Sequence, residues 1–215
     1  MSPFFPDLVT RTDEVRRAFE NDPVILDAVA HGMDIQRYRK FLLELYHVVW
    51  HFNPVTAAAA SRIPDTHRQV RYHLYEHMHE ESGHEQWVLD DLDAVGVTAQ
   101  DARAYPASAD TLAMCGYNYW QADRGNPCSV LGMLYALEVI ASVYGGTFTS
   151  AIRESLLLVG ERGTSFIGSH ATMDVAHMAS LRVVLNTLND DAARDAVVES
   201  TNVNFHLLTR IFAAV

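Results

Sequence analysis

The segment Ser165-Phe-Ile-Gly-Ser-His170-Ala-Thr-Met-Asp174-Val-Ala-His177 combines a helical apolar pattern with three residues able to bind a metal. At about 100° per residue, positions 170, 174 and 177 fall within roughly 60° of one another, so one helix face carries His, Asp and His. The residues around them are mostly apolar, which predicts a buried helix. Two imidazoles and one carboxylate at this spacing favour a metal site. Core histidines bonded to the backbone, with Asp174 as their partner, are the alternative.

The helical period continues through nearly the whole chain and predicts an all-α fold, a single domain over residues 1–215 with eight or nine helices. Pro54 is expected to kink the long helix that begins at Asp34, and Gly145-Gly146 is expected to break the chain between the helices over 128–144 and 147–159. Residues 98–106 are expected to form a polar connection with a short turn. The expected helices cover about 12–20, a segment capped by Asn21-Asp22-Pro23, 34–60, 66–94, 108–123, 128–144, 147–159, 165–188 and 191–213.

Charge and composition exclude several classes of partner. The 215 residues carry 16 Lys+Arg against 27 Asp+Glu, a formal charge of −11, and nucleic acids or anionic membranes require a basic surface. No apolar run reaches the roughly 18 residues that a membrane span needs. With no secretory leader and only Cys115 and Cys128, the chain is expected to be cytoplasmic, with two inert, partly buried thiols.

A second cluster of candidate ligands lies on the helix expected over residues 66–94. His73, His77, Glu80 and His84 share one stripe, and Glu81 lies at its edge. Glu81-Ser-Gly-His84 is an E-x-x-H pair, whose spacing lets a carboxylate and an imidazole bind one metal from adjacent turns. Gly83 is expected inside this helix, where close packing or a ligand would explain it. A solvated acidic face is the alternative for part of this set.

Glu138 is the only charged residue in the apolar stretch Leu131–Tyr144. A buried carboxylate without a cation or a proton costs several kcal/mol, so this residue needs a partner. A metal ion is one candidate, and an arginine from another helix is the alternative.

Three helices together supply three carboxylates and three imidazoles, a donor set that suits two iron or manganese ions bridged by carboxylate. A rival ferritin-like pattern uses Glu44-Leu-Tyr-His47, a second E-x-x-H pair, with His51 one turn further on. Glu44 and His47 could also line a substrate pocket, support the ligands or form a buried pair. The six candidates are Glu81, His84, Glu138, His170, Asp174 and His177.

Three motifs resemble those of the haem-oxygenase-like diiron oxidases and oxygenases: E-x-x-H, a lone Glu and H-x3-D-x2-H. The sequence from His79 to Leu92, followed by Gly96, is also similar to that of those proteins. The resemblance spans about residues 34–188. It implies that Glu81, His84, Glu138 and His170 are ligands and that Asp174 and His177 complete the second metal site. Members differ in the spacing on the first core helix, so Glu80 or His77 could replace Glu81.

The same resemblance implies two Fe ions, O2 as co-substrate, a small-molecule substrate and a homodimer. Related thiaminase II and coenzyme PQQ-synthesis proteins share the fold without this ligand set, and neither cysteine here has an obvious base partner. No histidine lies near the start of the chain, where haem oxygenases keep their axial ligand.

The predicted function is therefore a non-haem diiron oxidase or oxygenase that acts on a small organic acid, an amino-acid-like molecule or an acyl chain. Desaturation, C–C cleavage and N-oxygenation are the outcomes that the resemblance allows. The alternatives are a non-catalytic iron-binding bundle and a metal-free member of the fold that uses His and Glu for acid–base work. Tyr46, Tyr135 and Trp50 are possible redox relays, pocket walls or packing residues.

Overall fold

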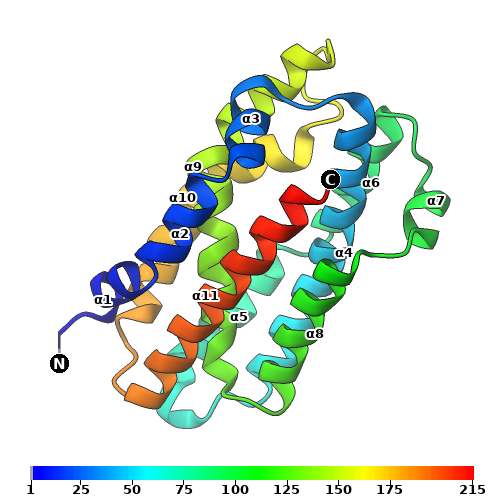
Figure 1. The fold of residues 1–215 in the computed structure, drawn as a ribbon. Coiled ribbons are helices and arrows are strands. Elements are labelled where there is room, and N and C mark those ends of the chain that lie inside the picture. The colour runs from blue at the N-terminus through cyan, green and yellow to red at the C-terminus, as the bar shows by residue number, and fades with distance from the viewer. Residues whose placement is uncertain (1) are drawn as a thin grey trace.

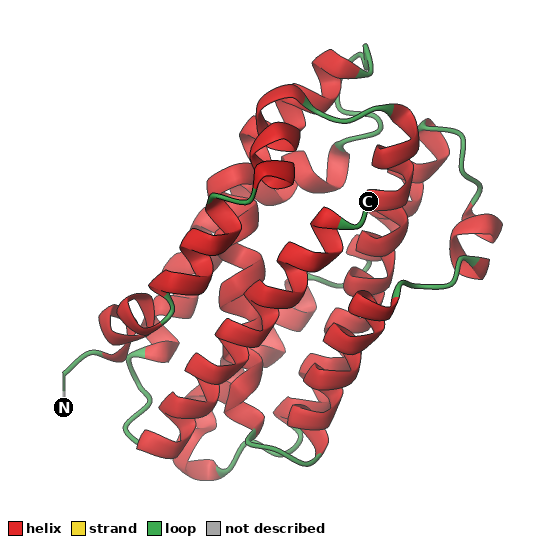
Figure 2. Cartoon of the chain, viewed as in Figure 1, coloured by secondary structure: helices red, strands yellow, loops and turns green. Residues whose placement is uncertain are grey.

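The computed structural model describes residues 2–215, which form eleven α-helices and two short 3-10 helices and contain no strand (Figure 2). The prediction of an all-α fold is confirmed. The α-helices are α1 (Phe4–Arg11), α2 (Asp13–Glu20), α3 (Pro23–His31), α4 (Ile35–Ala60), α5 (Arg68–Glu80), α6 (His84–Ala94), α7 (Ala99–Ala104), α8 (Ala109–Asp123), α9 (Val130–Ser155), α10 (Ser165–Leu185) and α11 (Asp191–Ala213). The 3-10 helices cover Asp65–His67 and Pro127–Ser129.

The long helices run lengthwise beside one another, and the short helices α1 to α3 cover one side of them (Figure 1). Helix α9 packs against both α10 and α11, and α4 packs against α5, α6 and α8. Large apolar side chains fill the space between the helices, with Tyr38, Phe205 and Leu134 among those that are fully buried. This packing brings α5, α6, α9 and α10 together, and these four helices and the turn between α5 and α6 carry all the candidate ligands.

Several helix starts follow directly from the sequence. Asp34 accepts hydrogen bonds from the backbone N–H groups of Gln36 and Arg37, and Asp22 caps α3, which has Pro23 at its first position. Side-chain acceptors at these positions satisfy N–H groups that lack a partner inside the helix. The starts of the second and third predicted helices are therefore correct.

The helix expected over residues 66–94 is interrupted, and this expectation is wrong. Helix α5 ends at Glu80 and α6 begins at His84, with Gly83 between them at φ +90°. Only glycine adopts that left-handed conformation without a steric penalty. Glu81 and His84 therefore flank a turn, and Gly83 lies in this turn instead of inside a helix.

The break expected at Gly145-Gly146 does not occur, because α9 runs without interruption from Val130 to Ser155. A Cβ atom at Gly145 would lie 3.2 Å from the Cβ of Ala171 on α10. The two helices thus approach closely where glycine removes a side chain. Tertiary packing outweighs the poor helix propensity of glycine at this point.

The helix expected over residues 34–60 is confirmed, because α4 continues past Pro54 to Ala60. Two short helices differ from the sequence-based expectation. Helix α1 precedes the first expected helix, and α7 lies within the segment expected to be a connection. These short segments have too few residues for a periodic pattern to be recognised.

One helix in residues 2–215, Pro127–Ser155, is long and apolar enough to cross a membrane by length and composition, so the expectation of no such run was too strict. Of its most apolar window, 67% is buried within the fold. The central helix of a folded bundle has the same composition, and here its apolar faces contact α10 and α11.

Candidate metal centre

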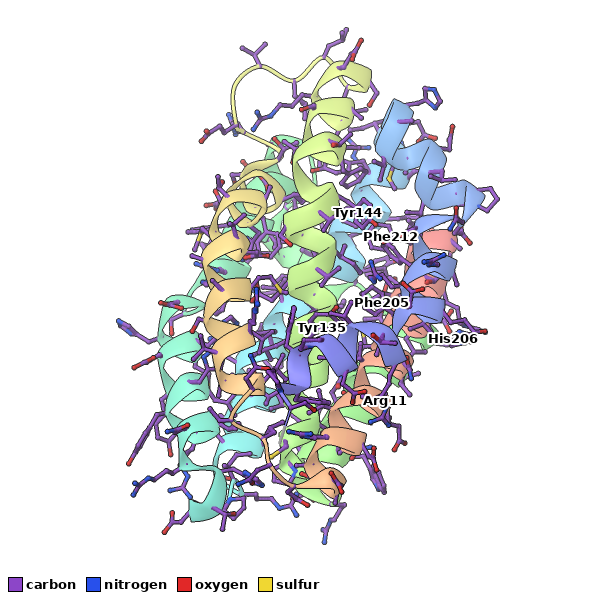
Figure 3. The ribbon with its side chains drawn as sticks, turned by 90° about the vertical axis from the view of Figure 1, so that its left-hand side faces the viewer. Arg11, Tyr135, Tyr144, Phe205, His206 and Phe212 are labelled. Carbon is purple, nitrogen blue, oxygen red and sulfur yellow. The ribbon has the colours of Figure 1, made fainter. Side chains whose placement is uncertain are left out.

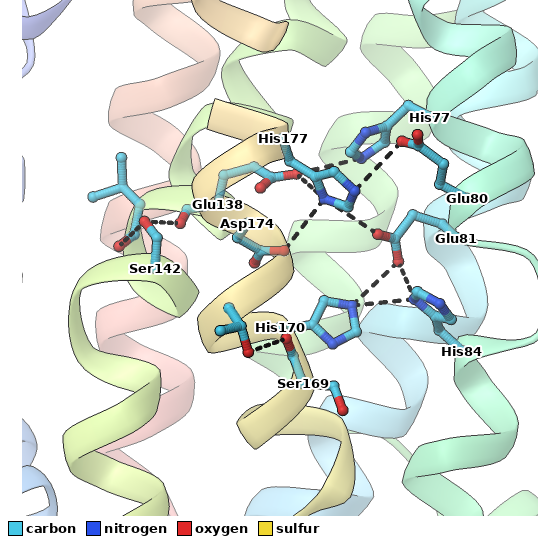
Figure 4. A network of polar contacts seen from close by, with 12 residues as sticks. His77, Glu80, Glu81, His84, Glu138, Ser142, Ser169, His170, Asp174 and His177 are labelled. Atoms are coloured by element: carbon cyan, nitrogen blue, oxygen red, sulfur yellow. Dashed lines mark hydrogen bonds and ion pairs between the residues drawn. The ribbon is translucent and has the colours of Figure 1, made fainter. Parts of the chain in front are cut away.

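Seven side chains from α5, α6, α9, α10 and the turn between α5 and α6 meet inside the bundle, and six of them form two adjacent groups of possible metal ligands (Figure 4). The first group is Glu81, His84 and His170, and the second group is His77, Glu138 and His177. Within each group, one ligand atom per residue lies within 4.8 Å of the others. Asp174 lies beside the second group, with its Oδ1 3.3 Å from Nδ1 of His177.

The three donor atoms of the first group are as close to one another as the ligands of a single metal ion. Nδ1 of His84 lies 2.7 Å from Oε2 of Glu81 and 3.2 Å from Nε2 of His170, which is 3.3 Å from the same carboxylate oxygen. Ligand atoms bound at about 2.0–2.2 Å to one metal ion lie about 3 Å from one another. The three donor atoms are therefore already spaced for a single ion.

The hydrogen bond of the His170 ring also indicates that the first group binds a cation. His170 Nδ1 lies 2.8 Å from the backbone carbonyl oxygen of Phe166, so a neutral ring donates its proton there and leaves a lone pair on Nε2. That lone pair faces the Glu81 carboxylate and the His84 ring. One extra proton or one metal ion must lie between these groups to offset their repulsion.

All three residues of the second group are buried, but fewer of their polar atoms have hydrogen-bond partners. Oε1 of Glu138 lies 3.4 Å from Nε2 of His77 and 3.4 Å from Nδ1 of His177. Four polar atoms here are buried without a hydrogen-bond partner: these two ring nitrogens, Oε2 of Glu138 and Oδ1 of Asp174. Four such atoms in one place are costly in a metal-free protein, and a metal ion would satisfy them together.

Glu81 links the two groups. Its Oε2 faces His84 and His170, while its Oε1 lies 3.7 Å from Nδ1 of His177 (Figure 4). A carboxylate with one oxygen toward each group can bridge two ions. The donor set of four imidazoles and three carboxylates thus fits two iron or manganese ions.

Burial and neighbouring charges shift the pKa values of these residues. Burial raises the pKa of Glu138 to about 7 and lowers the pKa of His77 to about 3. The carboxylates of Asp174 and Glu138 raise the pKa of His177 to about 10. Burial alone would raise the pKa of Glu81, but the rings of His170 and His84 outweigh it and hold that pKa well below its usual range. Neutral histidine and ionised carboxylate are the forms that bind metals, and a cation would favour both.

A carboxylate on α6 holds the start of α10 in place. Asp91 is 1% exposed and accepts hydrogen bonds from the backbone N–H groups of Ser165 and Phe166, at 2.8 and 2.9 Å. The pattern of one sequence does not reveal this long-range cap. Since α10 carries His170, Asp174 and His177, the Asp91 contact fixes their helix relative to His84.

All six residues named from the sequence lie in this cluster, and His77 joins them as a seventh. His77 does not replace Glu81, because each belongs to a different group. The half-exposed Glu80 approaches His177 from outside, with its Oε2 3.4 Å from Nε2 of that ring. The shared stripe of positions 73, 77, 80 and 84 was the signal for His77, and the E-x-x-H spacing was the signal for Glu81.

The second E-x-x-H pair lies apart from the cluster. Glu44 accepts hydrogen bonds from the hydroxyl of Thr111, at 2.6 Å, and from the backbone N–H of Ser108 at the start of α8. His47 Nε2 contacts the backbone carbonyl oxygen of Tyr105 at 2.9 Å. Neither residue lines the cavity beside the ligands. The ferritin-like arrangement is therefore wrong for this chain, and Glu44 stabilises the start of a helix.

A cavity of about 150 Å³ opens beside the ligands. His77, Glu81, Glu138, His170 and Asp174 form its polar end. Most of the remaining wall is apolar, and Tyr144 on α9 and Phe212 on α11 belong to it (Figure 3). Among the described residues that line it, none is lysine or arginine. The cavity can therefore hold an apolar group directly against the candidate metal centre.

Both cysteines are free, and neither lines this cavity. Burial raises the pKa of the Cys115 thiol to about 11 and that of Cys128 to about 12. These thiols stay protonated at neutral pH, as expected of inert buried cysteines.

Comparison with known proteins identifies the family. The family model described as an iron-containing redox enzyme matches residues 39–207, which include every residue of the two groups. The chain belongs to the iron-containing redox enzyme family. A search of curated proteins finds no significant match.

Solved structures show that this member of the iron-containing redox enzyme family has the haem-oxygenase-like fold. A domain of unknown function with that fold from Shewanella denitrificans is 23% identical, with a TM-score of 0.82 over 97% of this chain and 88% of that one. A TenA homologue from Pseudomonas syringae is 15% identical, with a TM-score of 0.81 over 99% and 94%. Heme oxygenase-1 from Synechocystis, solved with heme, is 17% identical, with a TM-score of 0.80 over 99% and 92%.

Proposed function

We propose that this chain is a non-haem oxidoreductase that binds two iron ions and uses O2 to oxidise a small organic molecule. The observation that carries the proposal is Glu81, whose two oxygens face two separate groups of buried ligands. The membership in a family of iron-containing redox enzymes supports the choice of iron. Two ferrous ions at this position would supply electrons for the reduction of O2.

The residues of the chain hold and orient the ligands. His84 and His170 would bind one ion and His77, His177 and Glu138 the other, with Glu81 between them. The backbone carbonyl of Phe166 fixes the ring of His170 so that Nε2 faces the centre. Asp174 lies against His177 and can bind an ion or orient that ring.

The cavity supports a substrate with an apolar body and one polar end. Phe41, Phe52 and Phe148 are among the side chains that would surround the body and exclude water from it. Because neither lysine nor arginine is among the described residues that line the cavity, a carboxylate on the substrate would find its main positive charge at the metal ions. Small organic acids, amino-acid-like molecules and acyl chains all have this shape, and the outcome is desaturation, C–C cleavage or N-oxygenation.

The test is anaerobic loading with Fe(II), followed by mixing with O2 in a stopped-flow spectrometer and an oxygen electrode. We expect O2 uptake and a visible absorbance change from the wild-type protein, both abolished in His170→Ala and Glu138→Ala. His206→Ala is the control, since this histidine is exposed on α11. Small acids and amino acids are then screened for faster decay of the absorbance change and for an oxidised product. Iron binding without O2 uptake would instead favour a non-catalytic iron-binding bundle.

A metal-free activity like that of thiaminase II is less well supported. The two thiols have raised pKa values and lie outside the cavity, so neither offers a nucleophile to a ligand bound there. Haem binding also lacks a ligand near the start of the chain. His31, the first histidine, is exposed at the end of α3 and contacts Asp27.

A further inference from the structure

Trp87 lies face to face with one of the candidate ligands. The ring centroids of Trp87 and His84 are 4.0 Å apart, with an angle of 25° between the planes. Trp87 also approaches His170 edge-on, at 6.0 Å between centroids. A single indole thus contacts both imidazoles of the first group.

No other tryptophan or tyrosine in the described part of the chain has its ring stacked on a candidate ligand. Besides Trp87, the carbocyclic aromatic rings beside His77 and His170 are those of Phe52 and Phe166, which are far harder to oxidise than indole. Trp50 contacts His51, Tyr46 contacts His47, and Tyr135 contacts Phe5. The three aromatic residues singled out from the sequence as possible relays therefore lie against residues other than the ligands.

Trp87 also connects the buried centre to the surface. His84 is 5% exposed, whereas Trp87, one helical turn further along α6, is half-buried. Its neighbours Gln86 and Asp90 are exposed and hydrogen-bonded to each other at 2.8 Å. One edge of the indole can therefore meet solvent or a reductant while its face rests on the ligand.

We infer that Trp87 is the residue through which electrons enter the metal centre, an inference that rests on the function proposed above. Reduction of O2 to water takes four electrons, and when no substrate is oxidised two ferrous ions supply only two of them, so the other two must enter from outside while the centre is still strongly oxidising. Trp87 would supply these electrons one at a time: for each, the indole would give one electron to the oxidised centre, and its radical cation would release the Nε1 proton to solvent. A one-electron reductant in solution then returns one electron, and one proton is taken up, so that the indole is restored.

The experiment mixes Fe(II)-loaded protein with O2 in the absence of substrate, freezes it within milliseconds and records the EPR spectrum. Iron content and O2 uptake are measured on the same samples. Wild-type protein is prepared with ordinary and with indole-deuterated tryptophan. Trp87→Phe keeps an aromatic ring on His84, and Trp120→Phe is the matched control, because Trp120 on α8 is 58% exposed.

We expect a transient organic radical whose spectrum narrows on deuteration, that disappears in Trp87→Phe and persists in Trp120→Phe. Ascorbate, a one-electron reductant, should shorten its lifetime. A wild-type protein that binds iron and consumes O2 without a tryptophan radical would overturn this inference and leave the proposed function standing. A radical that survives in Trp87→Phe would also overturn it. Failure to bind iron or to consume O2 would overturn the proposed function, and this inference with it.

Discussion

The chain contains two E-x-x-H pairs, and the structure uses them in opposite ways. Glu81 and His84 flank the turn between α5 and α6 and face His170, and Oε2 of Glu81 lies 2.7 Å from Nδ1 of His84. Glu44 and His47 lie inside the unbroken helix α4, where each contacts the segment that precedes α8. The same spacing thus forms part of a metal centre in one place and supports a helix start in the other.

The difference lies in the available partners and not in the motif. The carboxylate of Glu44 accepts hydrogen bonds from an amide and a hydroxyl, so it needs no cation. Around Glu81, Glu138 and Asp174, the neighbours are other carboxylates and imidazoles, and several atoms have no hydrogen-bond partner. A buried carboxylate surrounded by other carboxylates and imidazoles needs a cation, whereas one that accepts hydrogen bonds from an amide and a hydroxyl does not.

The largest expected contrast is in metal affinity. Glu81→Gln should weaken Fe(II) binding by at least about 100-fold, since loss of a ligand exceeds the effect of losing an outer partner. Glu44→Gln should leave binding unchanged, because that residue lies outside the cluster. Anaerobic calorimetry with Fe(II) measures both variants. Similar affinities for the two would refute the distinction between the pairs.

The second contrast is in folding stability. Glu44→Ala should lower the free energy of unfolding of the metal-free protein by about 2–3 kcal/mol, because it leaves the Thr111 hydroxyl and the Ser108 N–H without their acceptor. Glu76→Ala, at an exposed position of α5, is the control and should change stability by less than about 0.5 kcal/mol. Urea unfolding gives both values. An equal loss in the two variants would contradict a capping role for Glu44.

The third contrast concerns pH. Burial lowers the pKa of His73 on α5 to about 4, below its usual 6.5, so the unfolded chain binds a proton there that the folded metal-free protein does not. The stability contributed by neutral His73 is present above pH 6.5 and is lost as the pH falls toward 4, with about 2 kcal/mol lost by pH 5.

His73→Leu should therefore flatten the dependence of stability on pH between 7 and 5, as measured by urea unfolding of metal-free protein across that range. His51→Leu on α4 should have a smaller effect, because His51 is only partly buried. An unchanged slope in His73→Leu would show that the ring is solvated in the folded state.

The smallest contrast concerns the turn itself. Gly83→Ala should cost about 1–2 kcal/mol of stability, because alanine is strained at a φ of +90°. Gly116→Ala, inside α8 with open space around it, should instead gain about 0.5–1 kcal/mol through better helix propensity. Thermal unfolding of both variants provides the measurement. A gain in Gly83→Ala would mean that α5 and α6 can merge into one helix.

Periodicity was enough to predict the all-α class, because long amphipathic helices repeat their apolar residues over several turns. It failed at Gly83 and at Gly145, which act in opposite ways. Gly145 lies inside a helix and faces Ala171 across a close contact, whereas Gly83 ends a helix with a positive φ, and a Cβ atom there would meet no heavy atom within 4 Å. A single sequence does not contain that information.

The site was predictable to the extent that its residues share a helix face. His170, Asp174 and His177 lie on one face of α10, as their spacing indicated. The position of Glu81 between the two groups depends on its approach to His170 and His177 on α10, and the role of Asp91 depends on the approach of α6 to α10. These are contacts between residues distant in sequence, and local patterns do not reveal them.

The most direct test of the account is the number of Fe(II) ions bound per chain under anaerobic conditions. We predict two ions for the wild-type protein, one for His84→Ala, which removes a ligand of the first group, and one for His77→Ala, which removes a ligand of the second. A wild-type protein that binds no iron, or only one ion that either variant abolishes, would contradict the two-ion centre.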